Sequence, residues 1–225
     1  MYKRLLVIVL LLTSVGVYAQ ERALDYGGIA SAEAEVGLGK GFGLSIEEEL
    51  RFDQGFTQLD RWLNSVGVDY SCLHNRMNIG LTADYIRRHN DKGYFENRAR
   101  LGLQVTYTEE WHHFKFQLRS KLMSTFLDNR TGDHPVNPRL YWRNRLKLSY
   151  QPVNSRFRYA LSAELFLLTN DPRKSWSDNL RAVASVDYRL SRRYYLSAFA
   201  RIDYDLQPVN PEDIFYVGLT LKGKY

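Results

Sequence analysis

The chain has 225 residues, of which 44% are hydrophobic, 14% aromatic and 25% charged, a composition too apolar and aromatic for a disordered chain. Its net charge is +6, but the charges are spread along the sequence, so no nucleic-acid partner is expected. Cys72 is the only cysteine, which excludes an internal disulfide and a cysteine-based zinc cluster.

The N-terminus has the layout of a secretory signal peptide. Lys3 and Arg4 form a basic start, residues 5–12 are an unbroken apolar run, and Val17 and Ala19 provide small residues ahead of a cut before Gln20. The apolar run is too short and wrongly flanked for a spanning helix. We therefore predict a signal peptide over residues 1–19 and one domain over residues 20–225, whose net charge is +4 without Lys3 and Arg4.

Residues 97–108, NRARLGLQVTYT, alternate between two kinds of side chain. Leu101, Leu103 and Val105 fall on one parity, and Arg98 and Arg100 fall on the other. Successive side chains of a strand point to opposite faces, so this segment is a two-faced strand. In a soluble protein the apolar face would be inside, whereas in a transmembrane barrel it would face lipid.

Ten further segments repeat this alternation, and many approach the 9–11 residues that a tilted strand needs to cross a bilayer. With the segment above, the set is 32–38, 42–52, 62–70, 77–85, 99–107, 114–122, 146–150, 157–167, 180–188, 194–204 and 215–225. Single-chain bacterial barrels normally have an even number of strands. We therefore predict twelve strands, with residues 23–30 as a short extra one. A ten-stranded barrel with a separate N-terminal segment is the alternative.

The connections between these segments alternate in length. Short turns are expected near residues 39–41, 71–75, 108–113, 151–156 and 189–193. Longer polar connections are expected near residues 53–60, 88–93, 124–139, 168–177 and 205–213. One mouth with tight hairpins and one with loops is typical of outer-membrane barrels, whose longer loops are extracellular.

Aromatic residues gather at the tight-hairpin end. Tyr70, Tyr107, Tyr150 and Tyr188 each close a strand, and the steps from Tyr70 through these to Tyr225 are 37, 43, 38 and 37 residues. Rings at a fixed height suit a membrane interface. A soluble β-sandwich or a large lipocalin-like barrel remains the alternative, but it gives no reason for such a ring.

The fold expected from these signals is an all-β, transmembrane, antiparallel up-and-down β-barrel in the outer membrane. Its partners would be outer-membrane lipid and the barrel-assembly machinery, which would engage the C-terminal strand ending at Tyr225. Glu48 fits poorly, because it falls on the lipid-facing parity. A bulge within residues 47–49, or a position near the rim, would relieve it.

Four stretches with charged residues resemble a known family: EEELRF (47–52), NRARLGL (97–103), FKFQLRSKL (114–122) and YWRNRLKLSYQP (141–152). They look like the strands of a family catalogued as a domain of unknown function, number 2490. The resemblance implies a small outer-membrane barrel of a Gram-negative bacterium. It brings no established activity, and therefore no catalytic residue or cofactor.

Twelve charged residues on the predicted inward parity are candidates for lining a pore: Glu33, Glu35, Glu47, Glu49, Arg98, Arg100, Lys115, Arg119, Arg143, Arg145, Lys147 and Arg181. Acidic and basic sectors would face one another across the barrel. One interpretation is a structural barrel filled by ion pairs. Another is a narrow pore whose basic wall favours small anionic solutes. Ten to twelve strands lie between the packed interior of eight and the open channel of sixteen.

A barrel enzyme acting on envelope lipid or peptide at the extracellular rim is the alternative function. The sequence has neither G-x-S-x-G nor H-E-x-x-H, and no glycine-rich phosphate loop. His134 beside Asp133, with Asp128 nearby, is the one cluster worth testing, although a polar loop tip explains it equally well. His112 and His113 would point apart on a strand, so no metal site is expected there.

Overall fold

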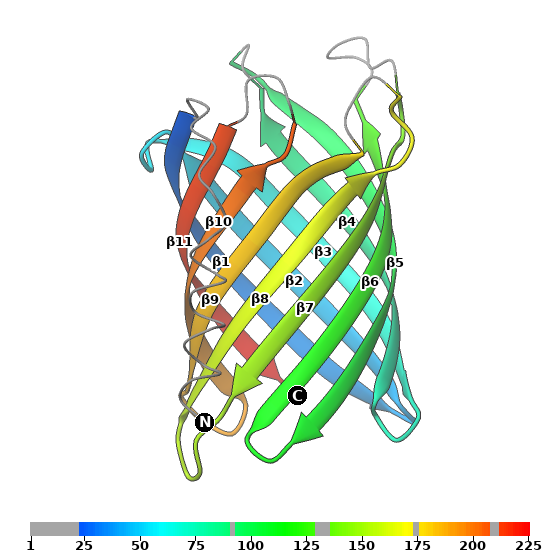
Figure 1. Cartoon of the computed structure of the whole chain (residues 1–225), viewed down its shortest axis with the longest axis vertical. Helices are drawn as coiled ribbons and strands as arrows, with labels where there is room; N and C mark the ends of the chain where they lie inside the picture. Colours follow the sequence, from blue (N-terminus) through cyan, green and yellow to red (C-terminus); the bar gives the residue numbers. More distant parts are fainter. Residues whose placement is uncertain (1–22, 91–92, 129–135, 173–175, 208–211) are drawn as a thin grey trace, which may run out of the picture.

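A computed structural model describes residues 23–90, 93–128, 136–172, 176–207 and 212–225, which leaves the predicted signal peptide outside the described residues. The described residues form one closed barrel of eleven strands (Figure 1). The strands are β1 (Ala23–Gly39), β2 (Phe42–Asp53), β3 (Gln58–Cys72), β4 (Met77–His89), β5 (Phe95–Trp111), β6 (Phe114–Leu127), β7 (Arg139–Tyr150), β8 (Phe157–Leu168), β9 (Ser177–Arg189), β10 (Tyr194–Asp205) and β11 (Glu212–Lys224).

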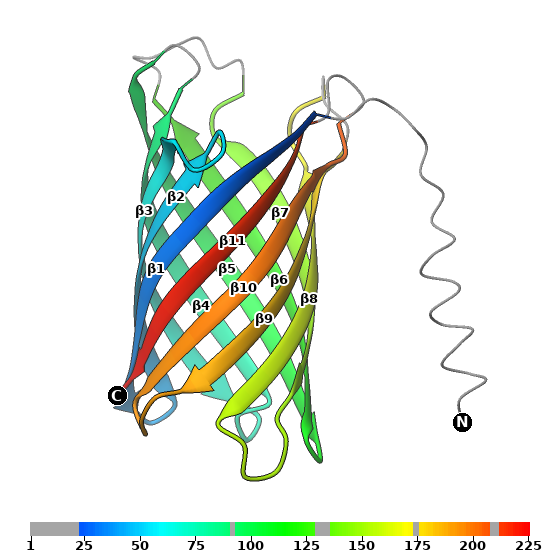
Figure 2. The ribbon, with the colours of Figure 1, turned by 90° about the vertical axis from the view of Figure 1, so that its left-hand side faces the viewer.

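Consecutive strands pair antiparallel all around the barrel, which confirms the predicted up-and-down order. The prediction of twelve strands is wrong, and so is the ten-stranded alternative. Residues 23–30 and 32–38 belong to one continuous strand, β1, because Ser31 pairs with Glu49 on one side and Thr220 on the other. An odd number of strands closes through a parallel pair, and β1 lies parallel beside β11 (Figure 2).

The side chains along the β1–β11 seam match its register. Ser31 Oγ lies 2.7 Å from Thr220 Oγ1, Lys222 Nζ lies 3.8 Å from a Glu33 oxygen, and Lys224 Nζ lies 2.6 Å from a Glu35 oxygen. Each of these contacts joins residues that are direct partners across the seam. A slip by one residue would turn every side chain of one strand to the other face, so these pairs fix the closing register.

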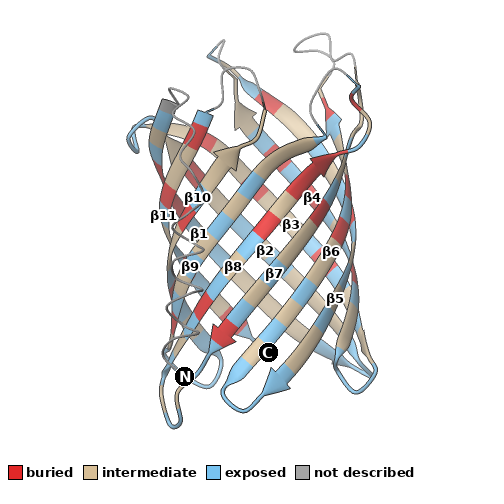
Figure 3. Ribbon diagram, in the orientation of Figure 1, coloured by how far each residue is buried: buried red, intermediate tan, exposed pale blue. Residues whose placement is uncertain are grey.

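Burial is inverted relative to a soluble protein. Leu101 and Leu146 keep 54% and 65% of their surface exposed, whereas Arg51 and Glu164 keep 6% and 4%. Figure 3 shows exposed residues alternating with intermediate or buried ones along the strands. The apolar face therefore points outward and the charged face lines the interior, so the lipocalin-like alternative is wrong. The described residues include no helix long and apolar enough to cross a membrane.

The predicted difference between the two mouths holds in part. At the long-loop mouth the β4–β5 connection spans only residues 90–94, fewer than the six residues of the β7–β8 connection, 151–156, at the other mouth. The two longest connections, residues 128–138 and 169–176, lie at one mouth, and the turn of residues 112–113 lies at the other. The β2–β3 connection, which the sequence suggested to be long, is shorter still and spans only residues 54–57. Positive φ angles at Gln54, Gly55 and Phe56 allow this tight turn.

Aromatic pairs form a girdle near the tight-hairpin mouth, as predicted. The ring centroids are 4.9–6.1 Å apart in the pairs Phe42–Tyr70, Phe114–Tyr150, Phe157–Tyr188 and Tyr194–Tyr225. Tyr107 lies slightly inside the girdle, because β5 continues beyond it to Trp111. Amphipathic rings at one height suit the boundary between hydrocarbon and water.

Glu48 lies on the outer face without the expected relief. It pairs in regular register with Ala32 and Asn64, and it sits midway along β2. The bulge of this hairpin falls between Arg51 and Phe52 instead. Glu48 is exposed, and Trp62 Nε1 donates a 2.9 Å hydrogen bond to its Oε1. The indole thus satisfies one carboxylate oxygen on the lipid-facing surface.

Replacing two adjacent glutamates by leucine should change stability in opposite directions. Glu48→Leu should raise the free energy of unfolding by about 1–2 kcal/mol, because it removes a charge from the lipid face. Glu49→Leu should lower it by about 3 kcal/mol, because it leaves the buried Arg51 without the carboxylate that lies 2.6 Å away. Urea titration in lipid vesicles measures both changes. Changes of the same sign would contradict the assignment of the two faces.

Candidate functional site

The barrel interior contains two cavities in line. The upper cavity, at the long-loop mouth, has a volume of about 670 Å³ and the lower one about 340 Å³. Five residues line both cavities, and we call them the neck: Arg51, Arg61, Arg100, Phe166 and Arg181. Four of the five are arginines from four different strands, so the two cavities meet at a ring of positive charge.

The strand alternation brings most of the predicted lining residues together. The lower cavity is lined by Glu33, Glu47, Glu49, Arg100, Arg119, Arg143 and Arg181. Arg98 lines the upper cavity. Arg145 and Lys147 follow Arg143 on the same inward parity of β7. Glu35 and Lys115 lie instead at the tight-hairpin mouth, where they pair with Lys224 and Glu110.

Two aromatic rings in the interior are each contacted by two arginines. The guanidinium carbons of Arg51 and Arg201 lie 5.2 and 5.0 Å from the centroid of the Tyr216 ring. Those of Arg143 and Arg181 lie 4.2 and 4.8 Å from the Phe166 centroid. Such contacts are attractive, and they hold the guanidinium planes in place. The two clusters therefore give the neck a rigid wall over β7–β11 and β2.

Two carboxylates connect these arginines. Glu164 accepts hydrogen bonds from Arg119 at 2.7 Å and from Arg143 at 3.0 and 3.1 Å. Asp203 accepts hydrogen bonds from Arg181 at 2.7 and 3.0 Å, and also from Arg201. Charge-assisted pairs of this kind offset part of the cost of removing the groups from water. Each acid is shared by two arginines, so positive charge remains in excess.

Three cations of β6 and β7 have no acidic partner among the described residues. Lys121, Arg145 and Lys147 form no ion pair with any residue that the structure describes. Lys121 is only 8% exposed and lies over Gly102, where an added Cβ would come within 2.4 Å of its Cε. Arg145 Nε donates no hydrogen bond to a described atom. These side chains form a positive wall on β6 and β7.

The charges are unevenly divided between the two cavities. Seven acidic and seven basic residues line the upper cavity, whereas four acidic and eight basic residues line the lower one. The predicted acidic and basic sectors therefore both border the lower cavity, but its basic residues outnumber its acidic ones. Glu33 and Glu49 are engaged by their strand neighbours Lys222 and Arg51.

Several residues of this site were not among the predicted lining residues: Arg51, Arg61, Asp84, Glu164, Phe166, Arg201, Asp203 and Tyr216. The charged residues among them could have been found from the sequence, because each falls on the inward parity of its strand. Phe166 and Tyr216 carry no such signal. Their apolar rings occupy polar positions, and only the arginines stacked on them explain why.

The remaining sequence candidates are the histidines and the acids near them. His134 and Asp133 lie outside the described residues, so the proposed enzyme cluster is not placed. His112 and His113 form the tight turn between β5 and β6. No group of three or more His, Cys, Asp or Glu side chains among the described residues could hold a metal ion.

A closed β-barrel that is apolar outside and charged inside has the layering of transmembrane β-barrels. The chain belongs to the family described as "Protein of unknown function (DUF2490)", which it matches over residues 30–211. This confirms the family resemblance. No curated protein matches the chain.

Two solved structures similar to the chain are described as porins. One is the NanC porin in a rhombohedral crystal form, with 16% identity, a TM-score of 0.49, and coverage of 81% of this chain and 88% of that chain. The other is an anion-selective porin from Comamonas acidovorans, with 14% identity, a TM-score of 0.39, and coverage of 83% and 53%.

Removing the carboxylate of Glu164, which Arg119 and Arg143 share, should destabilise the barrel. Glu164→Gln should cost about 3–5 kcal/mol, because Arg119 and Arg143 then lose their common carboxylate in a buried site. The control is Glu110→Gln, whose pair with Lys115 is exposed and should contribute about 0–1 kcal/mol. The heat-modifiability midpoint on semi-native gels measures both. Equal losses would contradict a buried network.

Proposed function

We propose that this protein is a narrow channel of the outer membrane that conducts small charged solutes and prefers anions. The observation that carries the proposal is the lower cavity, with eight basic residues against four acidic ones. Rings of arginine and lysine lower the barrier for negative solutes in a confined passage. Because equal numbers of acidic and basic residues line the upper cavity, it would admit solutes of either sign. The selection of anions over cations would take place in the lower cavity.

The paired and unpaired charges would have different roles. Glu164 and Asp203 and the arginines that they bind would hold the interior in shape, as in a purely structural barrel. A purely structural network has no need for cations without acidic partners. Lys121, Arg145 and Lys147 are such cations, and they would supply the attraction for a passing anion.

The proposed location is the outer membrane, with the long-loop mouth facing the exterior. The aromatic girdle at the tight-hairpin mouth and the apolar outer face support this location. In this orientation the first described residues of β1 lie at the outer mouth, since Gly55 N of the β2–β3 turn donates to Tyr26 O. Tyr225 lies at the opposite, periplasmic mouth (Figure 2).

Surface labelling tests the location and the orientation together. In a Cys72→Ser background, Thr57→Cys should react with an impermeant maleimide on intact cells, because residues 54–57 form an exposed turn at the outer mouth. Arg192→Cys, in the turn of residues 190–193, should react only after the outer membrane is permeabilised. The reverse pattern would overturn the orientation, and labelling of neither in permeabilised cells would overturn the location.

Planar-bilayer recording tests the channel itself. The refolded protein should give conductance steps, with a reversal potential in a salt gradient that indicates anion preference. Lys121→Gln/Arg145→Gln/Lys147→Gln should lower the anion-to-cation permeability ratio by about threefold, because three interior charges are lost. The matched control is Lys40→Gln/Arg76→Gln/Arg192→Gln, which removes three charges from exposed turns. Correctly inserted protein without conductance steps, or equal effects of the two variants, would reject the proposal.

A further inference from the structure

The upper cavity has its charges sorted to two sides of the barrel. Arg88, Arg98 and Arg139 line it from β4, β5 and β7, and we call them the arginine side. Five acids line it from β9, β10, β11, β1 and β2, and we call them the acidic side: Asp178, Asp205, Glu212, Asp25 and Asp53. The remaining lining charges are the four neck arginines and two acids that pair with them, Asp60 and Asp203.

The order of the strands places these two sides across the barrel from each other. In the ring of eleven strands, β7 and β2 are five strands apart in one direction and six in the other, and so are β5 and β11. Arg139 therefore lies across the cavity from Asp53, and Arg98 lies across from Glu212. A solute in the cavity thus has positive charge on one side and negative charge on the other.

Each side of the cavity has hydrogen-bonding atoms that no described residue satisfies. On the arginine side, the Nε atoms of Arg98 and Arg139 are buried donors without an acceptor among the described residues. On the acidic side, Oδ1 of Asp53 and Oδ1 of Asn179, which follows Asp178 on β9, are buried acceptors without a donor among them. Buried polar atoms normally have partners. A solute with a carboxylate at one end and an ammonium group at the other would supply both kinds.

Ion pairs within the protein leave several of these charges open. Arg139, Asp53 and Glu212 form no ion pair with a residue that the structure describes. Arg98 pairs at 2.8 Å with Glu96, two residues before it on β5, so its charge is partly offset. The guanidinium of Arg139 can therefore bind a carboxylate, and the carboxylates of Asp53 and Glu212 can bind a cation.

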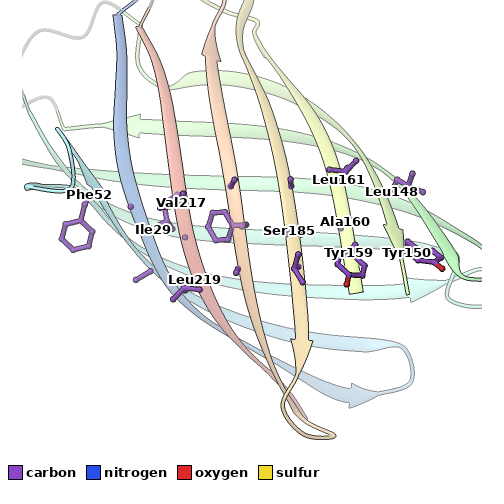
Figure 4. A pocket seen from close by; sticks show the side chains of 18 residues that line it. Ile29, Phe52, Leu148, Tyr150, Tyr159, Ala160, Leu161, Ser185, Val217 and Leu219 are labelled. Atoms are coloured by element: carbon purple, nitrogen blue, oxygen red, sulfur yellow. The ribbon is translucent and has the colours of Figure 1, made fainter. Parts of the chain in front are cut away.

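The apolar outer face strengthens this separation of charge. Leu161, Val217 and Leu219 line a hollow on the outer face of β8–β11 (Figure 4). Walls of low dielectric constant screen interior charges weakly and concentrate their field in the cavity. The carboxylate and the ammonium group of one solute would therefore be turned toward opposite sides.

We propose that the upper cavity binds small amphoteric solutes of net negative charge, of which amino dicarboxylates such as glutamate are the simplest class. One carboxylate would bind the arginine side, the ammonium group would bind Asp53 and Glu212, and the second carboxylate would be drawn to the neck arginines. A simple anion fits less well, because five acids of the same cavity would repel it. This inference rests on the proposed channel function, since it names the solutes that enter above the lower cavity.

Isothermal titration calorimetry of the refolded barrel in detergent micelles measures this binding with two probes. Glutamate should bind about tenfold more tightly than N-acetylglutamate, because acetylation removes the ammonium group that the acidic side would hold. Asp53→Asn/Glu212→Gln should abolish this preference. The control Glu109→Gln/Glu110→Gln removes as many acids from the tight-hairpin mouth and should keep it. Equal binding of the two probes by wild type, or an unchanged preference in the Asp53/Glu212 variant, would overturn the proposal.

A second variant tests the arginine side separately. Arg139→Gln should weaken the binding of both probes by about threefold and keep their ratio, because both carry the carboxylate that this arginine would bind. Lys40→Gln, in the exposed turn between β1 and β2, is the matched control and should change neither. Heat-modifiability gels check that each variant folds. Unchanged binding of both probes by folded Arg139→Gln protein would overturn the role of the arginine side.

Binding and conduction are measured separately, so the two proposals can fail separately. A barrel that gives anion-selective conductance but binds both probes equally would overturn the amphoteric site alone. A barrel that prefers glutamate as expected but gives no conductance steps would overturn the channel alone, and the binding site would stand.

Discussion

Every backbone N–H and C=O group that lies in hydrocarbon needs a partner within the protein, because no water is present to supply one. A sheet meets this demand only by closing on itself. Here the closure joins β1 to β11, and because the strand number is odd the two lie parallel. Three matched contacts, Ser31–Thr220, Glu33–Lys222 and Glu35–Lys224, set the register of this pair. The remaining strands are placed by hairpins, so this seam is the one step that the local sequence order does not dictate.

Closure with the apolar face outward forces the charged face into a confined interior. Charges there lose much of their hydration, and the arginines of the neck require pairing or stacking to offset that loss. The chain meets this condition with arginine rather than lysine at the neck, since a guanidinium can bind a carboxylate and stack on a ring at once. Arg143 does both, with Glu164 on its edge and Phe166 against its face. The same packing keeps the interior as two small cavities rather than one wide channel.

The alternation of side chains predicts the strands, the inverted layering and most of the charged interior, because a period of two is a property of the local chain. The strand number was not predictable in the same way. The sequence pattern of residues 23–39 is compatible with two short strands or one long strand. Only the pairing of this segment with both β2 and β11 shows that it is one strand. Glu48 was expected to need a bulge, but an indole from the next strand satisfies it instead. Phe166 and Tyr216 were missed for a related reason, since their partners come from other strands.

The odd strand number also shapes the charge of the interior. A twelfth strand would separate β1 from β11, whereas direct contact places Lys222 and Lys224 against Glu33 and Glu35. These two acids of the first hairpin are thus engaged at the seam. Lys121, Arg145 and Lys147 form no ion pair with a described residue. The positive excess on which the proposed anion preference depends therefore follows from how the barrel closes, as well as from how many arginines the sequence contains.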